Sequence, residues 1–452
     1  MRKTLIRMPL CLALAATFTP YAVAAVAAQS TLSGFALMPA NTFSDGPTSG
    51  QFAGTGAGGN ALPLLNKQPV QGVSTVLAGP VAGTYTLMTD NGFGAQNNSA
   101  DTLLRLYAVR PDWKTAAGGS GTVSAVHFST GAAQSSFNAA SRITLSDPDR
   151  KLGYALQADF THYYNNAANP LVDASIVSGR LLTGADLDTE SARRDKNGNL
   201  WFGDEFGPFL VKTDASGKVL AREARLPGVV SPQSPYLGAG PATLGSSRGF
   251  EGMAVNPAGD RLYTLLEGTV TGDPARTLRI NEFNVDTEAF TGAQWVYSLE
   301  TAGTAIGELT AISNTEFLVI ERNGATATGG GTPFKKIFKI DTTQLDANGR
   351  LVKTEVVDLM NIADPGDLNG DGSLVFTFPY VTIESVLIID ANTLLVINDN
   401  NYPGTGGRLL GVSDPTEFLR ISLATPVPEP GTWALMAAGL LGLCRAARRH
   451  GA

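Results

Sequence analysis

Alternation of apolar and polar residues marks short strands along this chain, whereas the spacing of an amphipathic helix is weak throughout. The segments TLRINEFNVD and AQWVYSLE alternate in this way and are bounded by turn residues. LWFGD at 200–204 predicts a half-buried strand that ends in Asp204 and is followed by Glu205. Because burying an unpaired carboxylate is costly, these two acids need a partner in the fold.

One pattern recurs along the chain. It consists of an acidic residue, a short apolar segment, a turn rich in Asn, Asp or Gly, an apolar strand and a second acidic or amide group. The first acids are Glu190, Glu251, Glu308 and Glu384. The second groups are Asp204 with Glu205, Glu267, Glu321, and Asn398 with Asp399. A further copy has Ser74 in the first position and Asp90 in the second.

The spacing of these copies predicts the fold. Positions 74, 190, 251, 308 and 384 are 116, 61, 57 and 76 residues apart. A spacing near 60 residues suits one four-stranded blade per repeat, and the longest interval leaves room for one more. The sequence therefore predicts an all-β fold, a β-propeller of about six blades. A pair of β-sandwiches is the structural alternative.

Equivalent positions of propeller blades meet around one axis, so the repeated carboxylates are expected to converge. Like charges at such short range repel strongly, and the cluster then needs a cation. Oxygen ligands without His or Cys favour Ca²⁺, then Mg²⁺ or Mn²⁺. Alternatively, individual acids cap turns or pair with nearby arginines, for which the candidates are Arg193, Arg194, Arg248 and Arg322.

Both ends of the chain differ from its body. Residues 1–28 combine Arg2, Lys3 and Arg7 with an apolar run and small residues, which predicts a secretory signal peptide. Residues 29–424 form the predicted propeller domain. Residues 425–452 contain a Pro-Glu-Pro triplet, an apolar stretch at 433–444 and a basic end. That stretch is too short for a stable membrane span and suits transient membrane contact.

The C-terminal order of motifs resembles the PEP-CTERM sorting signal. The resemblance implies an exosortase-type processing enzyme and a Gram-negative bacterium. It also implies export to the periplasm, the cell surface or an exopolysaccharide matrix. The two ends hold six of the 33 Lys and Arg residues, so the body is more acidic than the −7 of the whole chain. An acidic exported protein is a poor nucleic-acid binder and a plausible cation binder.

Four segments resemble the phytase-like family, also called "esterase-like activity of phytase": GADLDTES with the following GNLWFGDEFGPFL, RGFEGMAVNPAGDRLYTLLEG, FLVIERNG and TIESVLIIDANTLLVINDNNYP. The resemblance covers about Pro69 to Ser422 and implies a propeller-type hydrolase of phosphate esters. By position, the family's acidic motif residues fall at Asp188, Glu190, Asp204, Glu205, Glu251, Glu267, Glu308, Glu321, Glu384 and Asp399. Ser74 departs from the pattern, since it occupies an acidic position.

Two functions fit these features. In the first, Ca²⁺ held by the carboxylates binds a small phosphorylated substrate and activates water. Its expected catalytic residues are Glu205, Glu251, Arg248 and Arg322, the arginines acting as a phosphate clamp or as partners of the neighbouring Glu. In the second, a non-catalytic propeller stabilised by calcium binds matrix polysaccharide or a surface partner. The sorting signal favours the second function, and the repeated carboxylates favour the first.

Overall fold

The computed structural model describes residues 29–54, 61–159, 172–404 and 406–427. The predicted signal peptide and nearly all of the predicted sorting segment lie outside these residues. Strands dominate the described part of the chain. Within it, helix is confined to α1 (Ala174–Gly179) and to two single 3-10 turns, Ala139–Ser141 and Gln157–Asp159.

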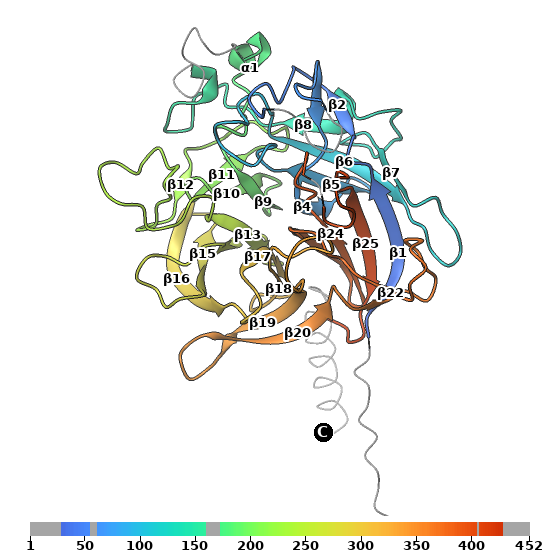
Figure 1. Cartoon of the computed structure of the whole chain (residues 1–452). Coiled ribbons are helices and arrows are strands. Elements are labelled where there is room, and N and C mark those ends of the chain that lie inside the picture. The colour runs from blue at the N-terminus through green and yellow to red at the C-terminus, as the bar shows by residue number, and fades with distance from the viewer. Residues whose placement is uncertain (1–28, 55–60, 160–171, 405, 428–452) are drawn as a thin grey trace, which may run out of the picture.

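Most strands belong to five units of four strands, called blades 1 to 5 here (Figure 1). Blade 1 consists of β4 (Val73–Ala78), β5 (Tyr85–Thr89), β6 (Arg105–Asp112) and β7 (Thr122–Ala125). Blade 2 consists of β9 (Thr189–Arg194), β10 (Leu200–Asp204), β11 (Phe209–Thr213) and β12 (Ala224–Arg225). Blade 3 consists of β13 (Phe250–Val255), β14 (Arg261–Leu266), β15 (Thr277–Asn284) and β16 (Ala289–Ser298). Blade 4 consists of β17 (Ala305–Ala311), β18 (Glu316–Arg322), β19 (Lys335–Leu345) and β20 (Leu351–Asp358).

Blade 5 combines the two ends of the described chain. It consists of β23 (Ser385–Asp390), β24 (Thr393–Ile397), β25 (Thr416–Ser422) and β1 (Thr31–Met38). β1 pairs antiparallel with β25 and touches β7 of blade 1 through one parallel pair, Leu37 with Thr122. The N-terminal strand therefore completes the last blade and closes the ring of blades.

The innermost strands show that this is a propeller. β4, β9, β13, β17 and β23 contact one another in this order, and β23 contacts β4 again. Such a closed ring confirms the predicted β-propeller and excludes a pair of sandwiches. Against the prediction of about six blades, the described residues form five four-stranded units.

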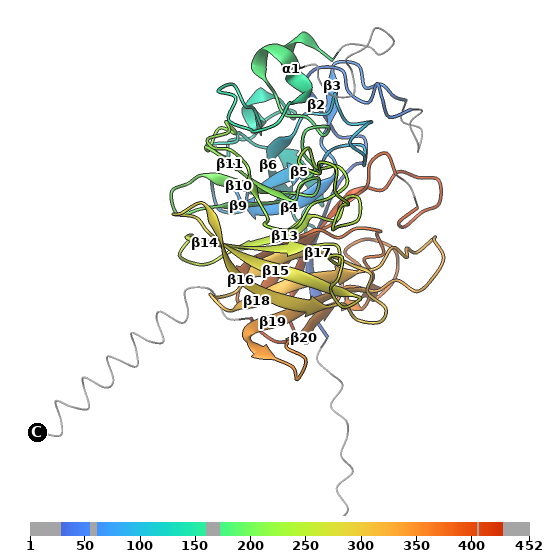
Figure 2. The same cartoon turned by 90° about the vertical axis from the view of Figure 1, so that its left-hand side faces the viewer.

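The remaining elements are short additions to the blades. They are β2 (Phe43–Asp45), β3 (Lys67–Pro69), β8 (Arg142–Thr144), β21 (Ile362–Ala363) and β22 (Val375–Phe376). β2, β3 and α1 lie together at one end of the molecule (Figures 1 and 2). The long interval from 74 to 190 thus holds blade 1 followed by an excursion through β8 and α1.

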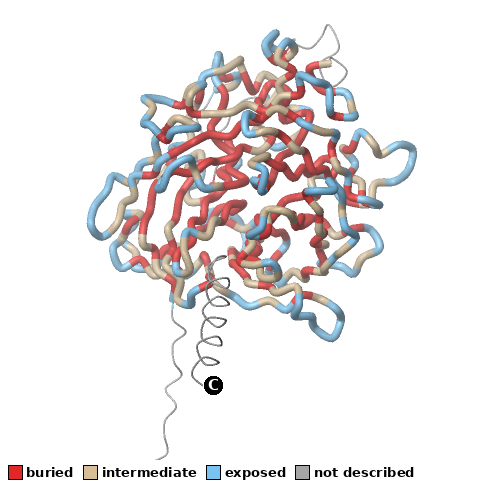
Figure 3. The backbone as a smooth tube through the Cα atoms, turned by 180° about the vertical axis from the view of Figure 1, so that it is seen from behind, coloured by how far each residue is buried: buried red, intermediate tan, exposed pale blue. Residues whose placement is uncertain are grey.

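The hydrophobic core lies between neighbouring blades, and alternate residues of one strand serve two interfaces. In β18, Phe317 and Val319 pack toward blade 3, whereas Leu318 and Ile320 pack toward blade 5. Figure 3 shows the buried backbone in the middle of the molecule and exposed loops around it. Strands buried on both faces read as continuous apolar runs. This explains why β10, predicted as half-buried, is buried at every residue.

Closure by β1 yields a test of the fold. Phe35 is buried in the interface between blades 4 and 5, with its ring centroid 6.1 Å from that of Phe376. Phe35→Ala should lower the free energy of unfolding by about 3–5 kcal/mol, because it removes a buried ring and leaves a cavity. Urea unfolding followed by tryptophan fluorescence measures the loss. Val352→Ala on β20, where the side chain is 47% exposed, is the control and should change the midpoint little. Equal urea midpoints for the two variants would show that the packing of Phe35 on β1 does not stabilise the closed ring of blades.

Candidate functional site

The first position of each repeat lies on, or directly before, the innermost strand of a blade. In blades 1 to 3 a β-bulge leaves one residue of this strand unpaired, and in blade 4 the corresponding bulge is at Gly307. In blade 5 the equivalent residue directly precedes β23. From blade 1 to blade 5 the occupants are Ser74, Glu190, Glu251, Gly307 and Glu384. In blades 1 to 4 the bulge aims this position at one end of the propeller channel, and Glu384 of blade 5 reaches the same end, where it contacts Ser74 and Arg322.

The second position lies at the end of the second strand of each blade, beside the first. From blade 1 to blade 5 its occupants are Asp90, Glu205, Glu267, Arg322 and Asp399. Four blades therefore present a carboxylate here, whereas blade 4 presents a guanidinium.

The two sets of side chains meet at one site. Ser74 Oγ donates a hydrogen bond to Glu384 over 3.1 Å, which joins blades 1 and 5. Carboxylate oxygens of Glu205, Glu251 and Glu267 lie within 4.8 Å of one another, which joins blades 2 and 3. We call the following residues the acid ring: Ser74, Asp90, Asp188, Glu190, Glu205, Glu251, Glu267, Arg322, Glu384 and Asp399.

Arg322 provides a positive charge inside the acid ring. Its Nη2 donates to Glu251 and Glu384 over 3.0 Å each and to Glu267 over 3.4 Å. The arginine and its three partners are all buried. Ion pairs of this kind require close hydrogen-bonded geometry to offset the loss of hydration, and Arg322 has three such contacts. The guanidinium therefore binds blades 3, 4 and 5 together at the centre of the propeller.

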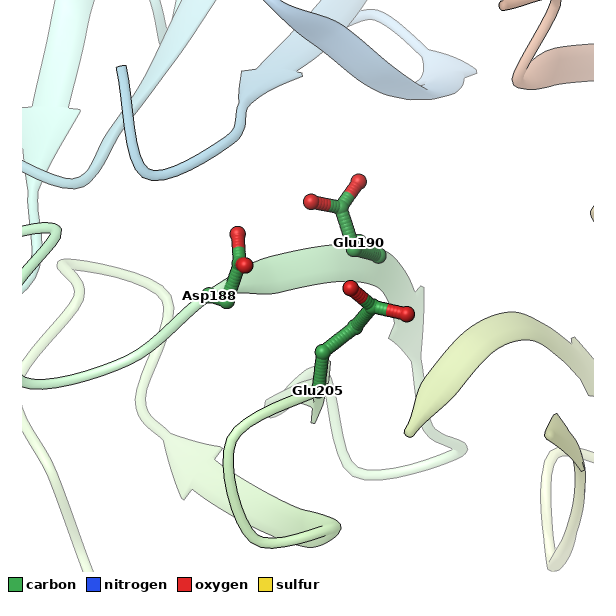
Figure 4. Close-up of side chains that lie close together, drawn as sticks. All are labelled: Asp188, Glu190 and Glu205. Carbon is green, nitrogen blue, oxygen red and sulfur yellow. The ribbon is translucent and has the colours of Figure 1, made fainter. Parts of the chain in front are cut away.

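The opposite half of the ring has carboxylates without such a partner. Oxygens of Asp188, Glu190 and Glu205 lie within 4.8 Å of one another, and Figure 4 shows the three side chains side by side. Asp188 Oδ1 and Glu205 Oε1 are buried and have no hydrogen-bond partner. Among the described residues, the ion pairs of the ring all involve Glu251, Glu267 or Glu384.

Burial and mutual repulsion raise the pKa values of these carboxyl groups. Burial raises the pKa of Asp188 to about 6. Burial, with the nearby Asp399, raises the pKa of Glu384 to about 8. The pKa values of Glu190, Glu205 and Glu251 are raised well above their usual range, first by burial and then by neighbouring carboxylates. Near neutral pH the ring therefore favours a bound cation or bound protons over full ionisation.

Asp204 lies beneath the ring and has a structural role. Its carboxylate accepts hydrogen bonds from the backbone N–H of Asp188 over 2.8 Å and of Gly207 over 2.7 Å. Burial raises its pKa to about 8. Asp204 thus fixes the turn after β10, and this turn directs Glu205 into the acid ring. Both acids of the LWFGDEF segment therefore have a partner or a place in the fold.

The structure places Glu308, which the sequence put among the metal ligands, outside the acid ring. The bulge in blade 4 falls on Gly307, so Glu308 is equivalent to Gly252 of blade 3 and points away from the channel mouth. A shift of one residue on a strand reverses the face of a side chain. Glu308 instead pairs with Arg193 over 2.9 Å, both residues being buried.

Glu321 is also outside the acid ring. It lies one residue before the second position of blade 4, so its side chain points toward the outer strands. There it accepts hydrogen bonds from Tyr297 of β16 and Lys353 of β20, each over 2.6 Å. The repeat pattern assigned Glu321 to the second position of blade 4. In the structure its neighbour Arg322 occupies that position instead.

Asp90 belongs to the ring, although the sequence comparison did not include it among the site residues. The sequence feature that could have identified Asp90 is its position, because it occupies the second acidic position of the first repeat copy. Asp90 is partly buried, its carboxylate accepts a hydrogen bond from the backbone N–H of Gly92, and its pKa is raised by desolvation and by Asp399. A Cβ at Gly72 would lie 2.2 Å from Asp90 Oδ1, so this close approach requires glycine.

Arg248 occupies the rim of the site. Its side chain is 46% exposed and contacts Glu267. Arg194, the remaining arginine considered as a partner of the acids, donates to the backbone of Gly198. Of the two predicted phosphate-binding arginines, Arg248 is accessible and Arg322 is buried among carboxylates.

The donor atoms of the ring suit a hard cation. They are carboxylate oxygens, and two of them are buried without a hydrogen-bond partner. Calcium and magnesium take such oxygen ligands, whereas zinc prefers His and Cys. The acidic clusters could therefore bind a metal.

Other cavities lie away from these carboxylates. One of about 740 Å³ opens between blades 2 and 3, where Phe209, Arg225 and Tyr236 line it. Another of about 320 Å³ lies at the opposite end of the inner strands, lined by apolar residues together with Arg193, Arg194 and Thr310.

Solved structures with a similar course of the chain share little sequence with it. An α-L-arabinofuranosidase from Clostridium thermocellum has 10% identity and a TM-score of 0.35, over 78% of this chain and 92% of that one. The arabinanase of Bacillus subtilis has 11% identity and a TM-score of 0.32, over 79% and 95%. The periplasmic gluconolactonase of Pseudomonas aeruginosa has 12% identity and a TM-score of 0.31, over 88% and 100%. These scores are too low to support an argument about activity.

Sequence families give a clearer result. Residues 426–449 match the PEP-CTERM protein-sorting motif, which indicates an exported protein processed by exosortase-type machinery. Within the described residues, no helix has the length and hydrophobicity that a membrane span requires. No curated protein matches the chain. Residues 68–402, which include every member of the acid ring, match the family described as "esterase-like activity of phytase", so the chain belongs to the phytase-like family.

Proposed function

We propose that this protein is an exported hydrolase of phosphate esters that depends on Ca²⁺ bound in the acid ring. The observation that carries the proposal is the half-ring of Asp188, Glu190 and Glu205, three buried carboxylates that form no ion pair among the described residues, although Arg248 lies near enough to act on Glu205. A structural cluster of acids is normally compensated by hydrogen bonds or arginines, as Glu251 and Glu384 are by Arg322. Membership of the phytase-like family supports the reaction class.

Calcium suits this half-ring better than the other hard cations. Ca²⁺ accepts six to eight oxygen ligands in irregular geometry, whereas Mg²⁺ demands a regular octahedron and retains several waters. The carboxylates come from the start of β9 and the end of β10 of one blade. Mg²⁺ and Mn²⁺ are the alternatives.

The side chains of the ring have separate roles in the proposed reaction. A cation bound there would neutralise phosphate charge and lower the pKa of a water molecule. Glu205 belongs to both carboxylate groups and Glu251 lies beside it in the second, so these two residues can orient the attacking water and accept its proton. Arg248, exposed at the rim, binds phosphate oxygens of the substrate. Arg322 holds Glu251, Glu267 and Glu384 in position and is a positioning residue.

The sorting motif supports a site of action outside the cytoplasm. The proposed location is the periplasm, the cell surface or the extracellular matrix of a Gram-negative bacterium, with a small phosphorylated molecule as substrate. The same motif favours a second candidate, a non-catalytic propeller that uses calcium for stability and binds matrix polysaccharide. Hydrolysis of p-nitrophenyl phosphate and its diester analogue, with Ca²⁺ and with EDTA, separates the two. Calcium-dependent release of nitrophenol supports the enzyme, and its absence together with retention on exopolysaccharide supports the binding protein.

Calcium should stabilise the native protein under either candidate function. A ligand at a thousand times its dissociation constant adds about 4 kcal/mol if it binds only the native state. We therefore expect a higher thermal midpoint in millimolar Ca²⁺ than in EDTA, measured by calorimetry with NaCl added to match ionic strength. Coincident midpoints would remove the basis for a calcium site.

Glu205→Gln and Glu308→Gln should have opposite signatures. Glu205→Gln removes a ligand charge, so calcium affinity and calcium-dependent hydrolysis should fall at least tenfold while the melting point in EDTA is kept or rises. Glu308→Gln leaves the buried Arg193 unpaired and should cost about 3–5 kcal/mol with or without calcium. Calorimetric titration and EDTA melts measure both effects. The proposed roles are wrong if Glu205→Gln binds calcium normally.

Arg248 should affect substrate binding and leave the cation site intact. Arg248→Gln is expected to raise KM about tenfold, the equivalent of about 1.4 kcal/mol, because one charge-assisted contact to phosphate is lost. Steady-state kinetics in saturating calcium measure this change. Arg261→Gln, on β14 in a surface pair with Asp260, is the matched control and should leave KM unchanged. An unchanged KM in Arg248→Gln would exclude this arginine from phosphate binding.

A further inference from the structure

We propose that the acid ring binds one divalent cation, held by Asp188, Glu190 and Glu205, and that the guanidinium of Arg322 takes the place of a second cation. The inference rests on the calcium dependence proposed above. It adds the number of ions, their position and the reason for the asymmetry of the ring.

By geometry alone the ring offers two cation sites. Asp188, Glu190 and Glu205 form one group, and Glu205, Glu251 and Glu267 form the other. In each group, carboxylate oxygens of all three residues lie within 4.8 Å of one another, and Glu205 belongs to both. Carboxylate spacing therefore does not distinguish them.

The position of Arg322 distinguishes the two groups. Its Nη2 is 3.0 Å from Glu251 and 3.4 Å from Glu267, two of the three members of the second group. It is also 3.0 Å from Glu384 in blade 5. A divalent ion among the same oxygens would be repelled by the guanidinium at close range and would compete with it for ligands. The second group is thus already neutralised by a cation that belongs to the chain.

In the first group, by contrast, no guanidinium of the described residues is paired with the carboxylates of Asp188, Glu190 and Glu205. None of its three carboxylates forms an ion pair with another described residue. Asp188 is 3% exposed and Glu205 5% exposed, yet Asp188 Oδ1 and Glu205 Oε1 lack any hydrogen-bond partner. Buried oxygens of this kind are rarely left unsatisfied in a native protein. Both residues belong to the group whose carboxylate oxygens lie within 4.8 Å of one another, which marks this group as the place of the ion.

Blade 4 accounts for the asymmetry. Its first position is Gly307, where a Cβ would lie 2.0 Å from the carbonyl oxygen of Ile383, so packing of blade 4 against blade 5 excludes a side chain. Its second position is Arg322 in place of the carboxylate found in the other blades. Blade 4 therefore contributes no ligand and supplies positive charge, which leaves the cation to the side of the ring formed by blade 2.

Calcium counting tests the proposal. The purified full chain, equilibrated with millimolar CaCl₂ and passed through a desalting column in micromolar Ca²⁺, should retain one Ca²⁺ per chain by elemental analysis. Arg322→Met should retain two, because Glu251 then has no guanidinium beside it and Glu267 keeps only the half-exposed Arg248. Arg248→Met, which removes the other arginine that contacts Glu267, is the matched control and should still retain one.

A second pair of variants keeps the proposal testable if Arg322→Met does not fold. Glu190→Gln should weaken calcium affinity at least tenfold in a calorimetric titration, whereas Glu251→Gln should change it less than threefold. Equal weakening by these two variants, or two Ca²⁺ in the unchanged protein, would overturn the single-ion assignment. Two ions together with calcium-dependent hydrolysis would overturn only this inference, whereas no bound calcium would overturn the proposed function as well.

Discussion

The hydrogen bonds from one buried guanidinium to carboxylates of two neighbouring blades are the interaction on which the centre of this protein depends. A propeller brings equivalent positions of its blades together, and in this chain those positions are acidic in most blades. The ring contains eight carboxyl groups, on Asp90, Asp188, Glu190, Glu205, Glu251, Glu267, Glu384 and Asp399. Such a cluster opposes closure of the ring unless positive charge enters it. Arg322 provides part of that charge from within the fold, and the carboxylates of blade 2 remain for an ion or for protons.

Stability and the candidate chemistry use different parts of the same strands. The middle of each strand alternates between two interfaces, so that every blade packs on both neighbours through apolar side chains. The acidic residues lie at the starts of the inner strands and at the ends of the second strands, where bulges turn them toward the channel mouth. At the other end of the channel, Arg193 and Glu308 form a separate buried pair. The apolar interfaces can therefore hold the blades together although the mouth of the channel contains carboxylates that repel one another.

Much of the fold was readable from the sequence. The repeat of acid, strand, turn, strand and acid led to the propeller because each blade repeats one strand order, and apolar runs marked the strands. The sequence also identified Glu190, Glu205, Glu251, Glu267, Glu384 and Asp399 as convergent acids. Spacing was a weaker guide to the blades themselves, since the long interval after Ser74 holds an excursion with β8 and α1 rather than a further unit among the described residues.

By itself the sequence determined that acidic residues recur with each repeat and therefore gather around one axis. It did not determine which acid of blade 4 takes part. Glu308 and Glu321 satisfy the pattern, yet a bulge at Gly307 turns Glu308 to the opposite face and brings Arg322, instead of Glu321, into the ring. Asp90 enters the ring because Gly72 leaves room for it, which only the packed structure reveals. The physical reason is the period of two along a strand: a one-residue change in register reverses every side chain, and register is set by pairing between strands rather than by the local sequence.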